Sequence, residues 1–142
     1  MEQNINYEKL VSVAIKALDS SYGGEPNSKY TFASAVLTEK GNIYAASNYV
    51  SDTASLTLHA EQAALSHAAA HKDTRIIAIA MVGKEDPKGE KICHPCGICK
   101  QLIWENSAKS GISVKVIMAN LKGKYIVKDI KEIVPYPWPD YQ

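Results

Sequence analysis

The stretch from Arg75 to Gly83, RIIAIAMVG, decides the fold, because it is a nearly continuous apolar run of strand length. Such a run is typical of a central strand that is buried on both faces of a sheet. Residues 58–71, which precede it, are rich in alanine and predict a helix that lies close against the sheet. Residues 95–106, which follow it, place apolar side chains at helical spacing behind Pro95 and predict a second helix.

Shorter segments complete the pattern on both sides of this centre. Residues 31–38 and 42–48 are rich in β-formers and flank a tight turn at 39–41, which predicts an antiparallel pair. Residues 113–119 and 124–127 flank a glycine-containing turn and predict two more strands. Apolar residues recur at spacings of three and four over residues 7–21, which predicts an amphipathic first helix.

The expected order is therefore helix, strand, strand, helix, strand, helix, strand, strand. Helices that alternate with strands indicate an α/β fold, here a three-layer α/β/α sandwich around a mixed five-stranded sheet. The 142 residues are the size of one ordinary domain, and no repeat or second domain is visible. Residues 1–142 are predicted to form a single domain.

Composition and charge narrow the classes of partner and compartment. Sixteen Lys and Arg against fifteen Asp and Glu leave a net charge of +1, so binding to nucleic acid through phosphate neutralisation is not indicated. No stretch approaches the roughly 20 apolar residues that span a bilayer, and residues 1–18 lack the apolar centre of a signal peptide. Three cysteines are too few for a secreted disulfide scaffold. We expect a soluble, cytoplasmic protein whose partner is a small molecule.

Two short motifs carry the chemistry. His59 and Glu61 stand at the start of the helix over 58–71, while Cys96 and Cys99 stand at the start of the helix over 95–106. An imidazole nitrogen and two thiolates are preferred ligands of Zn²⁺, and three protein ligands leave the fourth tetrahedral position open for water. Glu61, two residues from a ligand, is placed to move protons to and from that water and the substrate. The motifs predict a catalytic zinc site.

Other arrangements of the same cysteines give different functions. Cys93 and His94 could join Cys96 and Cys99 in a closed structural zinc knuckle, which would be a binding module without catalysis. A Cys-x-x-Cys redox site is a further alternative, but it leaves the histidine and glutamate of the other motif without a role.

His-x-Glu followed by Pro-Cys-x-x-Cys is the signature of zinc-dependent nucleobase deaminases, and the chain resembles the cytidine deaminase family. The segment from Pro95 to Gln101, PCGICKQ, is close to the Pro-Cys-Gly-x-Cys-Arg-Gln of free-nucleoside deaminases. The resemblance covers residues 30–138. It implies hydrolytic deamination of a free cytosine nucleoside (cytidine, deoxycytidine or an analogue) to the uracil form with release of ammonia. It also implies a homo-oligomer, either a homodimer or a homotetramer.

The resemblance further implies which residues contact the substrate. Asn48 corresponds to the family's nucleoside-binding asparagine, and the backbone N–H of Ala60 corresponds to a donor to the pyrimidine carbonyl. Tyr30 falls where the family has a ring that contacts the base. Trp138 lies in a tail that in relatives reaches a neighbouring active site.

Two departures from the family pattern bear on the site. His59 replaces the frequent first-ligand cysteine and Gln62 replaces an arginine, and one neutral imidazole with two thiolates balances the charge of zinc without that arginine. The family's Asn-x-Glu ribose pattern has Val50 in the place of its glutamate, and valine cannot accept a hydrogen bond from a sugar hydroxyl. A deaminase of blasticidin-S type is therefore the alternative enzyme.

Overall fold

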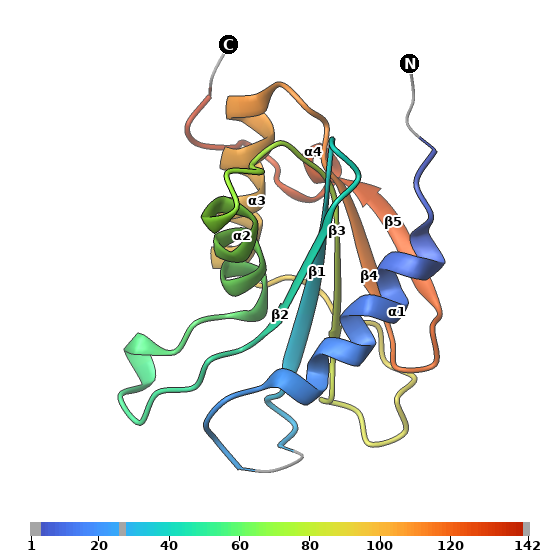
Figure 1. Ribbon diagram of the computed structural model, residues 1–142, viewed down its shortest axis with the longest axis vertical. Helices are drawn as coiled ribbons and strands as arrows, with labels where there is room; N and C mark the ends of the chain where they lie inside the picture. The colour runs from blue at the N-terminus through green and yellow to red at the C-terminus, as the bar shows by residue number, and fades with distance from the viewer. Residues whose placement is uncertain (1–3, 26–27, 141–142) are drawn as a thin grey trace.

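The computed structural model of the protein describes residues 4–25 and 28–140, and it shows a single mixed sheet between helices (Figure 1). The strand order is β2-β1-β3-β4-β5, in which β3 and β4 are parallel and the other neighbouring pairs are antiparallel. The strands are β1 (Phe32–Thr38), β2 (Ile43–Ser47), β3 (Ile76–Gly83), β4 (Lys115–Ala119) and β5 (Tyr125–Asp129). The predicted mixed five-stranded sheet is confirmed.

Helices cover both faces of this sheet. The main helices are α1 (Tyr7–Ala17), α2 (Ala60–Ala70) and α3 (Gly97–Ser110), with the short α4 (Ile130–Ile133) after β5 and single 3-10 turns at Leu18–Ser20 and Ala54–Leu56. The helix α1 crosses one face, while α2 and α3 lie together on the other, which is the predicted three-layer arrangement (Figure 1). Within the described ranges, no helix is both long enough and apolar enough to cross a membrane.

The central strand β3 divides the apolar core into two layers. Ile79 and Met81 belong to the layer under α2 and α3, whereas Ala78 and Ala80 belong to the layer under α1. All four side chains have no solvent exposure, because successive residues of a strand point to opposite faces and both faces are covered. The continuous apolar run is thus explained by burial on two sides.

Several element ends differ from the sequence predictions, and those of α3 and β5 are examples with a physical cause. The helix expected to end near residue 106 continues to Ser110, and it stops because Gly111 adopts a left-handed conformation with φ of 73°. The strand expected over 124–127 extends to Asp129, whose side chain then caps α4 by accepting from the Lys131 N–H. Glu132 completes this capping box by accepting from the Asp129 N–H at 3.0 Å.

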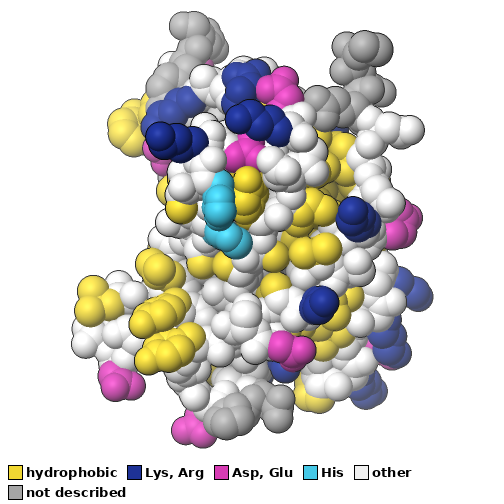
Figure 2. Space-filling view, in the orientation of Figure 1, with side chains coloured by type: hydrophobic (Ala, Val, Ile, Leu, Met, Phe, Trp, Pro, Cys, Tyr) yellow, Lys and Arg dark blue, Asp and Glu magenta, His cyan; other side chains and the backbone are white. Residues whose placement is uncertain are grey.

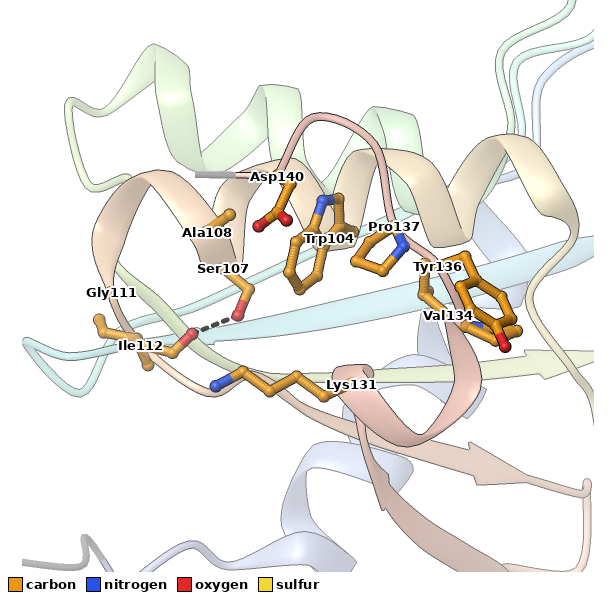
Figure 3. Close-up of a pocket in the computed structure, with 11 residues that line it drawn as sticks. Trp104, Ser107, Ala108, Gly111, Ile112, Lys131, Val134, Tyr136, Pro137 and Asp140 are labelled. Carbon is orange, nitrogen blue, oxygen red and sulfur yellow. Dashed lines mark hydrogen bonds between the residues drawn. The ribbon is translucent and has the colours of Figure 1, made fainter. Parts of the chain in front are cut away.

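The C-terminal segment, residues 134–140, returns across the outer side of α3. Gln101 Nε2 donates to the Trp138 carbonyl oxygen at 2.6 Å, and Trp104 Nε1 donates to the Pro139 carbonyl oxygen at 2.9 Å. A cavity of about 560 Å³ lies between this segment, α3 and α4, and the Trp104 ring forms part of its wall (Figure 3). The tail is therefore fastened to the same helix that begins with the predicted metal ligands.

Candidate active site

Two helix starts meet at one end of the sheet and bring the predicted ligands together. His59 is the N-cap of α2, and Cys96 is the N-cap of α3, with Cys99 in the first turn that follows. The backbone N–H of His59 donates to Gln62 Oε1 at 2.8 Å, which fixes the residue at the helix entrance. The positive end of a helix favours thiolates, so the start of α3 suits the two cysteines that it carries.

The three side chains converge on one point. Cys96 Sγ lies 3.3 Å from His59 Nδ1, and Cys99 Sγ lies 3.5 Å from the same nitrogen. All three ligand atoms lie within 4.8 Å of one another. A tetrahedral zinc ion with ordinary Zn–S and Zn–N bond lengths separates its sulfur and nitrogen ligands by about 3.6 Å. The donor set and its spacing fit zinc.

Glu61 lies beside this group in the first turn of α2. Its side chain is only 6% exposed, and burial raises the pKa of its carboxyl, although the Cys99 thiol and the His59 ring act in the opposite direction. Burial, followed by the charge of Glu61, raises the pKa of the Cys99 thiol. A cation held among these groups offsets both effects, because it favours the ionised thiol and carboxylate.

A cavity of about 420 Å³ opens from the metal group, within the size range of small-molecule sites. Its lining combines the ligand end of the site with the ends of the strands β1, β2 and β3: Tyr30, Phe32, Asn48, Thr57, Leu58, His59, Ala60, Glu61, Glu85, Cys93, His94 and Cys96. The structure thus gathers six of the eight predicted site residues around one cavity. Cys99 lies behind them as a buried member of the metal group, and Trp138 lies outside.

Asn48 is the best-fixed of the predicted substrate contacts. Its Oδ1 accepts from the Phe32 N–H at 3.1 Å, and its Nδ2 donates to the Tyr30 carbonyl oxygen at 3.0 Å. The amide therefore ties the end of β2 to the start of β1 and retains one N–H for a ligand. Tyr30 is 66% exposed at the rim of the cavity, and Ala60 has a backbone N–H without an intrahelical acceptor.

The closed zinc knuckle does not form. Cys93 and His94 line the cavity, but among the residues that the structure describes, only His59, Cys96 and Cys99 form a group that could hold a metal ion. Burial raises the pKa of Cys93 to about 12, which favours an inert thiol.

Comparison with known proteins points to the same chemistry. A family model described as the cytidine and deoxycytidylate deaminase zinc-binding region matches residues 4–115. The chain belongs to this family. It is 31% identical over 131 residues to a cytidine deaminase of Sporosarcina psychrophila, which covers 92% of this chain and 90% of that protein. It is 29% identical over 128 residues to a cytidine deaminase of Halalkalibacterium halodurans, which covers 90% of each chain.

The fold of this family member agrees with a solved relative. The crystal structure of cytidine deaminase from Burkholderia pseudomallei matches with a TM-score of 0.79 and 25% sequence identity, over 94% of this chain and 100% of that one. The family region is zinc-binding, and the His59, Cys96 and Cys99 group provides the place for the ion, so zinc is the cofactor.

Sequence analysis missed several residues of the cavity of this deaminase-family chain. Phe32, Thr57, Leu58 and Glu85 line it without belonging to either motif. Thr57 and Leu58 come directly before His59, so their sequence position could have indicated that they lie near the metal end of the cavity. Glu85 follows the end of β3, and nothing in its local sequence showed that the loop returns toward the metal end.

Proposed function

We propose that the protein is a zinc-dependent hydrolase that deaminates a free cytosine nucleoside to its uracil form and ammonia. The observation that carries the proposal is the convergence of His59, Cys96 and Cys99 beside the buried Glu61 at the end of a cavity of nucleoside size. These three residues would hold the zinc ion, and a set of three protein ligands is typical of catalytic zinc, which keeps a position for water or substrate.

When bound, zinc supplies Lewis-acid chemistry that activates water for attack on the carbon bearing the amine. Glu61 moves the protons. Its carboxylate takes one proton of the water and delivers it to the ring nitrogen. It then takes the proton that remains on the added hydroxyl and delivers it to the amine, which leaves as ammonia. The burial of Glu61 suits this task, because it holds the carboxylate between the metal group and the cavity.

The remaining predicted contacts orient the substrate. The free N–H of Asn48 donates to the nucleoside, and the Ala60 N–H donates to the pyrimidine carbonyl. Tyr30 lies at the rim, where its ring packs against the substrate. These groups hold the amine-bearing carbon against the metal end, so the water and Glu61 meet it in one geometry.

Replacing Glu61 tests the mechanism directly. Glu61→Gln should fold and retain zinc but lose about 10²–10⁴-fold in kcat, because the proton carrier is gone and the ligands remain. The readout is the absorbance change as cytidine becomes uridine, with zinc content measured on the same samples. Glu105→Gln, on the outer part of α3, is the matched control and should keep full activity. Full turnover by Glu61→Gln would remove this residue from the mechanism.

A deaminase of blasticidin-S type is the second candidate, and the position of Val50 favours it. Val50 lies against Gly23 and Gly24, where a Cβ at Gly24 would meet its methyl groups at 3.6 Å, and it is absent from the cavity lining. Position 50 therefore supplies no side-chain acceptor for a sugar to this cavity. Rates on cytidine, deoxycytidine and blasticidin S, measured in one assay, separate the two candidates: a preference for blasticidin S supports the second.

We also propose that the chain works as a homodimer or homotetramer. Figure 2 shows hydrophobic side chains on the projecting segment between β2 and α2, where Tyr49, Leu56 and Leu58 are 44–65% exposed. Trp138 is 78% exposed and lies outside its own chain's cavity, which leaves it free to approach a neighbour. Light scattering coupled to size exclusion tests the assembly, and a monomer at assay concentration would contradict it.

A further inference from the structure

The cavity carries a second carboxylate that the proposed mechanism does not use. Glu85 lines the cavity together with Glu61, but it belongs to the loop after β3 instead of the helix α2. Its side chain is 45% exposed and therefore faces solvent at the cavity, whereas Glu61 is buried beside the metal group. A carboxylate in this place faces whatever part of the substrate points away from the reacting amine.

The backbone around Glu85 fixes this position. The N–H of Lys84 donates to the Thr31 carbonyl oxygen at 2.9 Å, which places Glu85 next to the start of β1 and therefore next to Tyr30. Beyond it, the Asp86 carboxylate accepts three backbone N–H groups at 3.0 Å, from Lys88, Glu90 and Lys91. The loop is closed on itself, so Glu85 is presented from an ordered rim.

Its carboxylate also retains hydrogen-bonding capacity. The nearest cation is Lys91, whose Nζ lies 4.0 Å from Glu85 Oε2, which is too long for a hydrogen bond. In the same lining, Asn48 Oδ1 already accepts from the Phe32 N–H, and only one N–H of the amide remains. A sugar hydroxyl donates as well as accepts, so it needs an acceptor that Asn48 does not provide.

The charge of the lining points the same way. It includes two carboxylates and neither lysine nor arginine, while Lys29, at 5.1 Å from the Tyr30 ring, and Lys91 lie outside it. A hydroxyl gains a charge-assisted hydrogen bond from Glu85, whereas a phosphate at the same place meets a like charge.

We propose that Glu85 makes the cavity select nucleosides over nucleotides. Its carboxylate accepts a hydrogen bond from a sugar hydroxyl of the nucleoside and repels the phosphate of a nucleotide. The inference rests on the proposed deaminase function and extends it, because it commits the site to unphosphorylated substrates and names the residue responsible. Glu85 is a specificity residue, and proton transfer stays with Glu61.

The test compares cytidine with cytidine 5′-monophosphate on the zinc-loaded protein. Glu85→Gln should raise KM for cytidine about 10-fold while kcat stays within about twofold, because a hydrogen bond to a charged acceptor is weakened and the chemistry is untouched. The same variant should turn over the monophosphate faster than the wild type does, since the repulsion is gone and Lys91 becomes available to the phosphate. A merely structural role for Glu85 does not produce this gain.

Two further variants complete the experiment. Glu85→Asp retains the charge and should keep the discrimination against the monophosphate, while Glu90→Gln, on the same loop but outside the cavity lining, should match the wild type on both substrates. An unchanged preference in Glu85→Gln, or an equal change in Glu90→Gln, would overturn the inference while cytidine turnover by the wild type still supported the deaminase. A wild type inactive on cytidine would instead overturn the proposed function.

Discussion

The hydrogen bond from the His59 N–H to Gln62 Oε1 makes Gln62 a positioning residue for a metal ligand. Removing the Gln62 amide should lower both the stability of the fold and the affinity for zinc. The bond is 2.8 Å long, half-buried and between neutral groups, so it contributes about 1 kcal/mol to folding. Gln62→Ala loses this but gains a few tenths of a kcal/mol in helix propensity. We therefore expect the zinc-free protein to unfold about 3 °C lower than the wild type.

The effect on zinc should be larger than the effect on folding. Without Gln62, the residue that carries the imidazole is held less firmly at the entrance of α2, and loss of such outer hydrogen bonds typically weakens metal binding at least about 10-fold. Competition with a chromogenic chelator measures the zinc dissociation constant, and thermal unfolding in excess EDTA measures the stability of the zinc-free chain. The two measurements separate positioning from folding.

Two control variants make the prediction specific. Gln62→Glu keeps an acceptor for the same N–H and adds a negative charge that suits a helix N-terminus, so its zinc affinity should remain within about threefold of the wild type. Gln101→Ala removes a glutamine whose amide holds the Trp138 carbonyl oxygen, so it should lower stability without weakening zinc. Wild-type zinc affinity in Gln62→Ala, or an equal loss in Gln101→Ala, would refute the reasoning.

Two further predictions concern the thiol beside the cavity and the packing of α2. Burial raises the pKa of Cys93 from 9.0 to about 12, so the contribution of this thiol to folding is complete below pH 9 and is lost as the pH rises toward 12. Between pH 9 and 12, Cys93→Ala should therefore lose less free energy of unfolding than the wild type does, as measured by chemical denaturation. An identical loss in the two proteins would contradict this. Ala64 is fully buried between α2 and the sheet, so the larger side chain of Ala64→Leu should overpack the core and lower the free energy of unfolding by about 1–3 kcal/mol. Ala69 lies on the exposed side of α2, so Ala69→Leu should change the free energy of unfolding by less than about 0.5 kcal/mol.

The sequence predicted the parts of the fold that depend on local periodicity. The run over residues 75–83 identified the central strand, because a strand buried on both faces has apolar residues at successive positions, without alternating polar ones. The extension of α3 to Ser110 was missed although Gly111 offered a helix-stop signal, since the apolar spacing weakens after residue 104. The helix α4 was missed because its four residues are too few for a periodicity, and only the Asp129-x-x-Glu132 capping box marked it.

In the candidate site, the residues of the metal group were predictable from the sequence, whereas a residue of the cavity wall was not. The convergence of His59, Cys96 and Cys99 beside Glu61 was predictable, because the chemistry of zinc restricts both the residue types and their spacing. Glu85 was not, because it reaches the cavity only through the pairing of β3 with β1 and the closure of the following loop. Local sequence specifies a ligand motif, whereas the wall facing it depends on which strand ends lie side by side.

The first ligand and the residue three positions later form one physical unit in this chain. Two thiolates balance the charge of zinc, so the neutral imidazole of His59 leaves no surplus negative charge for a cation at position 62 to offset. A neutral side chain is then sufficient there, and Gln62 uses its amide oxygen to hold the backbone of His59 at the start of α2. An arginine, which has no acceptor, could not make this bond. The exchange of both family residues agrees with one change in ligand charge, and the hydrogen bond gives Gln62 a structural role of its own.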